Sequence, residues 1–373
     1  MDWTVRFAET REGNQRVGSH TINGLGMKTL ADVFDPARNS LNAIRLLLAA
    51  TVIVSHSWLV NGLGVPPMVN GTDPGLVAVA GFFAISGFLV TSSRLREKSL
   101  LRYLRRRFLR IYPAFLIVLV VVAFVLAPLS VLIDARNSVE WNSAITYVLS
   151  NAGLFVQQTT IDRTLVNNAF PFVWNIPLWT LLYEALCYLL IGLVVSFVPA
   201  RLLGASIATL LALSTAVSLS FRVWPGAFPS PMLDNAASLG SFFLAGALLF
   251  LYGKKMPASG VLVVLFVLLM SVLAIAGIFK PLAAVPGAYV VFFVASRLPR
   301  PFTRIGRRND ISYGMYIYGF PVQQLVILVI GGAVLPIWVF AIVCILLTVP
   351  FAWLSWFLVE KPALRRRSTT TDT

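Results

Sequence analysis

Long apolar stretches alternate with short polar or basic segments along most of the chain. Most of these stretches have the length that an α-helix needs to cross about 30 Å of hydrocarbon, roughly twenty residues. The pattern predicts an all-α, polytopic transmembrane helical bundle of about ten spans, at 41–60, 75–93, 111–133, 177–198, 203–221, 235–252, 258–278, 281–297, 311–331 and 334–358. A weaker apolar stretch lies at 139–157.

Lysine and arginine collect in some of the segments between the apolar stretches and are absent from the loop 61–74. Because short cytoplasmic loops carry the excess of these residues, we expect both termini in the cytoplasm and 61–74 outside. The basic segments are 94–110, 254–255, 297–308 and 361–367.

This orientation requires residues 134–176 to begin and end on the outside. Segment 139–157 is therefore expected to be re-entrant or interfacial, which its Asn, Gln, Tyr and Trp content permits. The alternative is an eleventh span that breaks the charge rule.

Composition excludes a soluble protein. Of 373 residues, 58% are hydrophobic and only 12% are charged, with a mean hydropathy of +0.81, whereas soluble domains carry about 25% charged residues. The net charge of +15 would suggest nucleic acid in a soluble protein. Here the basic residues lie between apolar runs, so we expect contact with membrane lipids and no nucleic-acid partner.

The ends of the chain and its two cysteines add little chemistry. Residues 1–40 are polar and lack the apolar core of a signal peptide, so they are expected to form a loosely ordered cytoplasmic extension. Residues 363–373 form a basic cytoplasmic tail. Cys187 and Cys344 lie in separate apolar runs and predict neither a disulfide nor a metal site.

Three ionisable residues stand well inside predicted spans, where charge is costly and usually functional: Arg45, His56 and Glu184. Arg45 and His56 are eleven residues apart in one span, which places them about 20° from the same helix face and about 16 Å apart along the axis. The shared face predicts a polar stripe that lines a cavity. The alternatives are an arginine that extends to the inner headgroups and a histidine that only joins two helices.

Glu184 and His56 lie at similar depths below the outer ends of their spans. An imidazole and a carboxylate at one depth are suited to an acid/base pair, in which the carboxylate fixes the tautomer and raises the basicity. The alternative is a structural hydrogen bond without chemistry.

The first basic segment ends in a run that contains Arg106, Arg107 and Arg110. Arg107 and Arg110 are neighbours on one helix face, and guanidinium groups pair well with phosphates. The alternative is a topology signal that contacts anionic lipids. Gly81 to Phe88, rich in small and aromatic residues, predicts close helix packing.

Taken together, these segments resemble the acyltransferase-3 family from about Leu41 to Pro362. Its landmarks occur in order: an arginine followed eleven residues later by a histidine, a Phe-Phe-x-x-Ser-Gly-Phe element, an Arg-Arg-x-x-Arg-Ile-x-Pro element, a Trp…Glu element, a tyrosine-rich late span and a closing Glu-Lys-Pro. Here they are Arg45 to His56, Phe82 to Phe88, Arg106 to Pro113, Trp179 to Glu184, Asp310 to Tyr318 and Glu360 to Pro362. Two positions differ from many relatives: Ala80 replaces an acidic residue, and Gly319-Phe320-Pro321 lacks a histidine.

The resemblance implies that residues 41–362 form a transmembrane acyltransferase domain in the bacterial inner membrane. It implies a cytoplasmic acyl-coenzyme A donor, with acetyl as the expected group, and an exported or lipid-linked glycan as acceptor, such as exopolysaccharide or O-antigen. Arg45, Arg106, Arg107 and Arg110 would bind the coenzyme A phosphates, His56 and Glu184 would carry the catalysis, and Trp179, Tyr183 and Tyr313 would contact the sugar. A polysaccharide-synthesis machinery is a further expected partner.

Two other functions remain open at this stage. Ten spans with an internal polar stripe also suit a transporter or flippase of a lipid-linked glycan or an anionic solute, although no paired inverted halves are visible. The second alternative is an assembly subunit that has lost its activity. Ala80 permits this alternative, because many relatives carry an acidic residue at that position.

Overall fold

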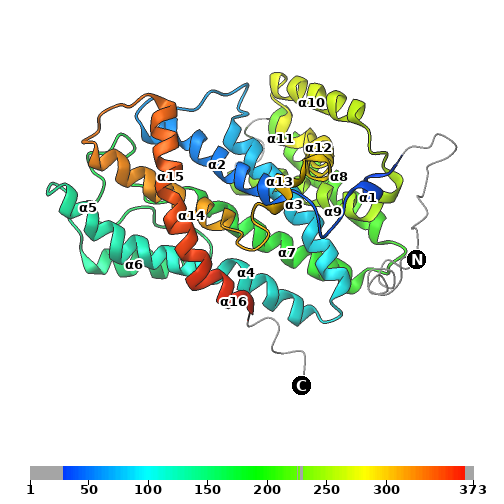
Figure 1. The fold of residues 1–373 in the computed structure, drawn as a ribbon, viewed down its shortest axis with the longest axis horizontal. Coiled ribbons are helices and arrows are strands. Elements are labelled where there is room, and N and C mark those ends of the chain that lie inside the picture. Colours follow the sequence, from blue (N-terminus) through cyan, green and yellow to red (C-terminus); the bar gives the residue numbers. More distant parts are fainter. Residues whose placement is uncertain (1–27, 225, 227–229, 366–373) are drawn as a thin grey trace.

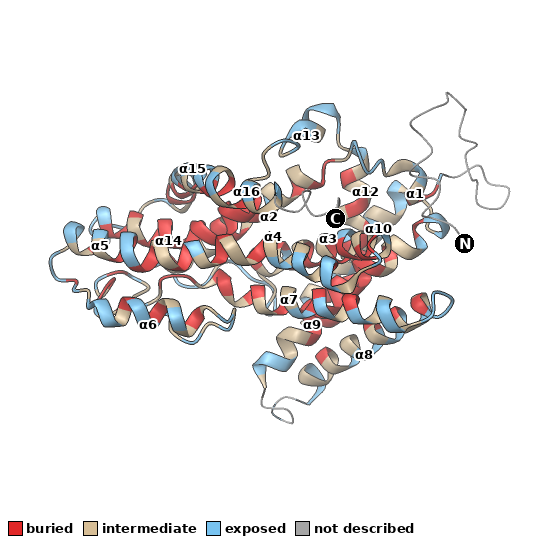
Figure 2. Cartoon of the chain, turned by 90° about the horizontal axis from the view of Figure 1, so that it is seen from below, coloured by how far each residue is buried: buried red, intermediate tan, exposed pale blue. Residues whose placement is uncertain are grey.

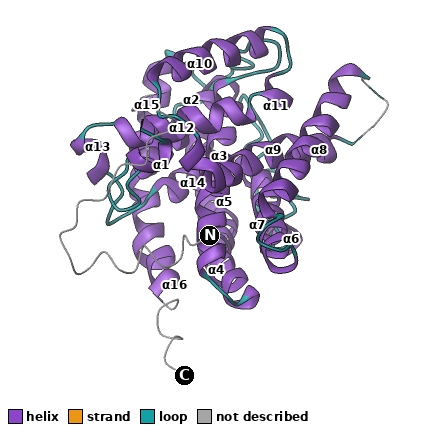
Figure 3. Ribbon diagram, turned by 90° about the vertical axis from the view of Figure 1, so that its right-hand side faces the viewer, coloured by secondary structure: helices purple, strands orange, loops and turns teal. Residues whose placement is uncertain are grey.

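The computed structural model describes residues 28–224, 226 and 230–365. In this part of the chain all the regular secondary structure is helical (Figure 3). The α-helices are α1 (Leu30–Val33), α2 (Leu41–Val60), α3 (Pro74–Arg96), α4 (Leu100–Val121), α5 (Ala127–Ile133), α6 (Trp141–Asn151), α7 (Thr180–Phe197), α8 (Leu203–Val223), α9 (Pro231–Tyr252), α10 (Gly260–Ile275), α11 (Phe279–Leu282), α12 (Ala284–Arg297), α13 (Arg300–Arg304), α14 (Ser312–Val329), α15 (Ile337–Ser355) and α16 (Lys361–Arg365). Short 3-10 or π-helical segments are η2 (Val122–Leu126), η3 (Pro177–Trp179), η4 (Gly253–Lys255) and η5 (Trp356–Glu360).

Helices occupy all ten ranges that the apolar pattern predicts as spans. Among the described residues, seven helical segments are long and apolar enough to cross a membrane: Leu41–Val60, Pro74–Arg96, Leu100–Ile133, Pro177–Phe197, Leu203–Val223, Pro231–Lys255 and Ile337–Arg365. The other three ranges hold the shorter apolar helices α10 and α12 and the more polar helix α14. The all-α, multi-pass architecture is confirmed, and the number of spans stays a prediction.

Loops that the charge pattern assigns to one side of the membrane contact one another. On the predicted cytoplasmic side, the Leu30 amide donates to the Met256 carbonyl at 2.8 Å, and the Ser40 amide donates to Ala295 at 3.0 Å. On the predicted outer side, the Asn61 side chain donates to the Leu335 carbonyl at 2.8 Å. In Figure 1, α5 and α6 lie at one end of the long axis and α1 at the other. This grouping agrees with the predicted arrangement, and its orientation stays a prediction.

The described part of the polar N-terminal extension is packed on the bundle. Thr29 caps α1 in a reciprocal arrangement with Asp32, and the segment bonds to the 256–258 loop through Leu30 and through the Ala258 amide, which donates to Lys28. The loose order expected of the extension is therefore wrong for residues 28–40. Residues 1–27 and most of the tail, 366–373, lie outside the described residues.

The weak apolar stretch at 139–157 forms the eleven-residue helix α6. Such a helix rises about 16 Å, roughly half of the hydrocarbon thickness. The loop after it returns to α14, where Asn168 donates to the side chain and the carbonyl of Gln324. The length favours the prediction that this segment does not cross the membrane.

The core is centred on α14 and on the crossing of α3 with α9. Nearly every residue of α14 is buried (Figure 2). At the α3–α9 crossing, a Cβ on Gly87 would lie 1.8 Å from the Phe243 carbonyl oxygen, and one on Gly246 would lie 2.0 Å from that of Ala84. Small residues thus let the two backbones touch, as the Gly81–Phe88 pattern predicts.

Gly87→Ala is expected to destabilise the protein by about 1–3 kcal/mol or more, because the added methyl group forces two helix backbones apart. The measurement is the thermal unfolding midpoint of the purified protein in detergent. Gly260→Ala is the matched control, since nothing lies within 4 Å of a Cβ at that helical position. Equal midpoints for the two variants would contradict the close crossing.

Candidate functional site

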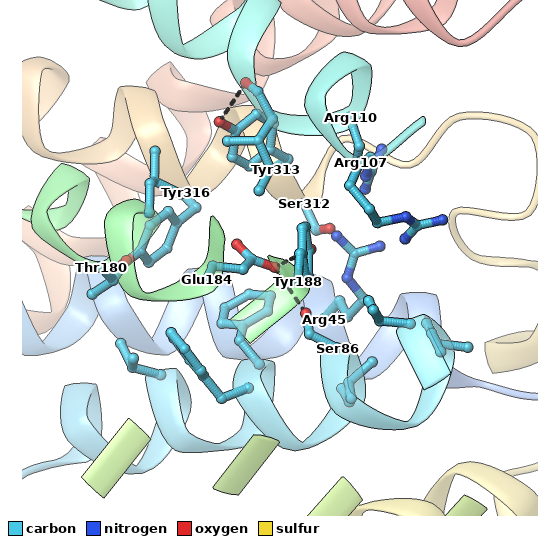
Figure 4. Close-up of a pocket in the computed structure, with 18 residues that line it drawn as sticks. Arg45, Ser86, Arg107, Arg110, Thr180, Glu184, Tyr188, Ser312, Tyr313 and Tyr316 are labelled. Carbon is cyan, nitrogen blue, oxygen red and sulfur yellow. Dashed lines mark hydrogen bonds between the residues drawn. The ribbon is translucent and has the colours of Figure 1, made fainter. Parts of the chain in front are cut away.

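A first cavity, of about 100 Å³, lies among α2, α3, α4, α7 and α14. Three arginines line one side of it: Arg45, Arg107 and Arg110. Figure 4 shows Thr180 and Tyr316 on the other side, with Glu184 between the two groups. The first cavity therefore runs from a cationic end to a polar end, with a carboxylate between them.

Two of these arginines share one partly buried carboxylate. Arg45 forms an ion pair with Asp310, and Arg110 Nη2 lies 2.9 Å from the same Asp310 Oδ2. Arg110 also lies 3.8 Å from Glu360 Oε2, at the end of η5. Asp310 precedes α14, so the turn into that helix delivers it to α2 and α4.

The charge of Asp310 is held by this arrangement. Burial alone would raise the pKa of its carboxyl group, but the guanidinium groups of Arg45 and Arg110 outweigh burial and hold the pKa well below its usual range. The Ser312 hydroxyl donates to Asp310 at 2.6 Å and acts in the same direction. Asp310 is therefore ionised at neutral pH and keeps the two arginines side by side.

Arg107 and Arg106 are adjacent in sequence but have different surroundings. Arg107 donates to Ser93 at 3.2 Å and lies over the Tyr188 ring at 5.8 Å. Its buried Nε has no hydrogen-bond partner among the described residues. Arg106 pairs with Glu97 at 2.8 Å and does not line the first cavity. Of the four predicted phosphate ligands, three thus lie together and one lies apart.

Glu184 is bound in the first cavity by two hydroxyl groups. Ser86 donates to its Oε1 at 2.9 Å, and Tyr188, one turn further along α7, donates to the same oxygen at 2.5 Å. Ser86 belongs to the Gly81–Phe88 segment, whose composition predicts helix packing and gives no sign of a contact with Glu184.

A second cavity, of about 250 Å³, contains His56. It opens among the end of α2, the start of α3, and α9 and α11. Its polar lining includes Asp73, Asn235, Ser238 and Lys280, four residues that no sequence pattern predicted as part of a site. His56 meets the Phe320 ring edge to face at 5.3 Å.

Asp73 is the carboxylate that shares the second cavity with His56. As the N-cap of α3, it accepts hydrogen bonds from the amides of Gly75 and Leu76, at 2.7 and 3.1 Å. It also accepts the Ser55 hydroxyl at 2.9 Å. These bonds hold the Asp73 carboxyl group in place in the cavity that His56 lines.

The two cavities are neighbours. They share three lining residues, Val79, Thr180 and Tyr316. His56 and Glu184 therefore lie in adjoining cavities, and within the described chain no hydrogen bond joins their side chains. The direct acid/base pair considered from their depths is absent from this structure.

The predicted sugar ligands are divided between these regions. Trp179 lines the second cavity and Tyr313 lines the first, where its hydroxyl donates to the Ile111 carbonyl at 2.9 Å. Tyr183 is buried, lines neither cavity, and packs edge to face on Trp179 at 5.5 Å. Tyr183 thus supports Trp179.

Comparisons with known proteins identify the family and two relatives. The model of an acyltransferase-domain family, the acyltransferase-3 model, matches residues 38–357. An O-acetyl transferase of Shigella phage Sf6 is 28% identical over 349 residues, which cover 88% of this chain and 97% of the relative. Nodulation protein 10 of Rhizobium leguminosarum bv. viciae is 29% identical over 360 residues, which cover 89% of this chain and 95% of the relative. No solved structure matches the chain.

Proposed function

The chain belongs to the acyltransferase-3 family, and from that premise we propose that it moves an acyl group from cytoplasmic acyl-coenzyme A to a hydroxyl of an exported or lipid-linked glycan. The acyl group in this proposal is acetyl, and the site is the bacterial inner membrane. The observation that carries the proposal is the series of two adjoining cavities, one with arginines and one with the histidine.

The first cavity is the proposed donor site. Coenzyme A carries phosphate groups, and guanidinium groups bind phosphates with paired, charge-assisted hydrogen bonds. Arg107 has a buried Nε without a hydrogen-bond partner among the described residues. Arg45 and Arg110 share the Asp310 carboxylate, so a phosphate can add negative charge beside the three arginines. The extended pantetheine arm, on the order of 15–20 Å, is similar to the roughly 16 Å rise between Arg45 and His56.

The second cavity is the proposed acceptor site. A sugar offers hydroxyl groups and apolar ring faces, and this cavity combines Asp73, Asn235, Ser238 and Lys280 with the indole of Trp179. In the predicted orientation it opens toward the outer side, where an exported glycan or lipid-linked sugar would arrive. Components of a polysaccharide-synthesis machinery are proposed to deliver this acceptor.

His56 is the proposed general base. Its imidazole accepts the proton of the sugar hydroxyl as the oxygen attacks the thioester carbonyl. A brief acyl-histidine intermediate is the other route open to the same residue. Asp73 supports the charge that develops on the imidazole, whereas Glu184, bound by Ser86 and Tyr188, acts from the donor side.

The test is thiol release together with label transfer from radiolabelled acetyl-coenzyme A, in membranes that contain the protein and native envelope glycans. We expect free thiol and labelled glycan in equal amounts, and neither in membranes that lack the protein. A transporter or flippase would move its solute without releasing thiol. If neither acetyl- nor succinyl-coenzyme A releases thiol, the proposed function is wrong.

A further inference from the structure

The two cavities meet at three side chains, one from each of three helices: Val79 of α3, Thr180 of α7 and Tyr316 of α14. We propose that this junction is the passage through which the acyl group reaches His56, and that Val79 limits the length of the acyl chain. The inference rests on the proposed function and names the residues that select its donor.

Tyr316 is fixed across the junction by hydrogen bonds. Its hydroxyl lies 2.7 Å from Thr180 Oγ1 and donates to the Pro177 carbonyl at 3.0 Å. The Phe82 ring packs edge to face against it at 5.7 Å. Because its polar partners are Pro177 of η3 and Thr180 at the start of α7, the tyrosine ring forms a wall of fixed position.

Val79 provides the other wall. It precedes Ser86 by seven residues, two turns of α3, so both face the same side of that helix. A β-branched side chain in a helix is held in one preferred rotamer. The passage therefore lies between a tethered aromatic ring and a rigid aliphatic group.

The reaction places the thioester at this junction. The sugar oxygen forms a bond to the acyl carbon while the carbon–sulfur bond breaks, and the hydroxyl proton passes by way of His56 to the departing thiolate. The thioester arrives from the first cavity, whereas the base lies in the second. The acyl carbon must then lie beside Val79 and Tyr316, and a longer chain would collide with these walls.

The experiment compares acetyl-, propionyl- and butyryl-coenzyme A as donors in membranes that contain the wild type or Val79→Ala. We expect the ratio of butyryl to acetyl transfer to rise roughly tenfold or more in the variant, since one methylene in a close-fitting pocket changes selectivity about 10–200-fold. Val77→Ala is the control, because Val77 is exposed on the same helix and lines neither cavity. Its ratio should equal that of the wild type.

Val79→Ile tests the same passage in the opposite direction and keeps the β-branch. This variant should lower the ratio of propionyl to acetyl transfer. If Val79→Ala does not accumulate in the membrane, Val79→Ile alone tests the inference. The inference is overturned if neither variant changes the ratios, if Val77→Ala changes them equally, or if the wild type uses all three donors alike. A wild type without thiol release from any donor would instead refute the proposed function itself, and the passage with it.

Discussion

Replacing His56 with alanine is expected to lower the rate of acyl transfer by about 10²–10⁴-fold, the usual contribution of a positioned general base. Among the residues that line the two cavities, His56 is the only imidazole, the side chain that most often serves as a general base. The measurement is label transfer from acetyl-coenzyme A at matched protein levels in membranes.

The matched control for this variant is Thr51→Ala on the same helix. Among the described residues, the Thr51 hydroxyl has one hydrogen bond, to the Leu47 carbonyl of its own helix, and that bond is exposed. The Thr51→Ala variant should transfer acyl groups at the wild-type rate. A normal rate in His56→Ala would remove the histidine from the chemistry and assign the central role to Glu184.

Arg110→Gln is expected to affect stability and donor binding together. The change leaves Glu360 and Asp310 with one arginine in place of two, and breaking a buried ion pair from one side costs about 3–5 kcal/mol. It also removes a charge-assisted hydrogen bond to phosphate, worth about 1.5–3 kcal/mol, so the KM for acyl-coenzyme A should rise roughly tenfold or more. Thermal unfolding and donor titrations measure the two effects separately.

Arg106→Gln is the informative comparison, because the same element supplies both arginines. Arg106 pairs with Glu97 away from the first cavity, and Arg102 lies 3.5 Å from the same carboxylate and can replace it. Its donor KM should therefore stay within about twofold of the wild type. An equal rise of the donor KM in both variants would mean that acyl-coenzyme A binds through the total charge of the basic segment and not through individual guanidinium groups.

The helical pattern predicted much of the fold because hydrophobic length is a property of each segment alone. The ten apolar ranges coincide with helices, and loops assigned to one side contact one another. The pattern could not show that α10 and α12 are shorter than a full span. Nor could it show that residues 28–40 bond to the loop at 256–258, since that contact joins distant parts of the chain.

The candidate site was predictable only for residues whose type is unusual where they stand. A charge inside a span singles out Arg45, His56 and Glu184. Asp73 was not predicted, and Asp310 was predicted only as the start of the tyrosine-rich element, because each lies in a loop, where acidic residues are ordinary. Their importance arises from folding, which brings Asp73 into the cavity of His56 and Asp310 between two arginines.

Arg106 and Arg107 also show what sequence alone cannot predict about a site. Arg106 and Arg107 differ by about 100° around one helix, and the sequence does not state which direction faces inward. That direction is set by α3 and α7, which offer Ser93 and Tyr188 to Arg107 and leave Glu97 to Arg106. Helix faces acquire their chemistry from neighbours that periodicity does not identify.

The composition of α14 has a consequence for how the protein is synthesised. This helix carries three tyrosines and two glutamines, and Gln323 donates to the Ile53 carbonyl and the Ser57 hydroxyl of α2. These glutamines and tyrosines find partners in the folded bundle that lipid does not offer. We therefore expect α14 to insert stably only after α2, which is synthesised some 250 residues earlier.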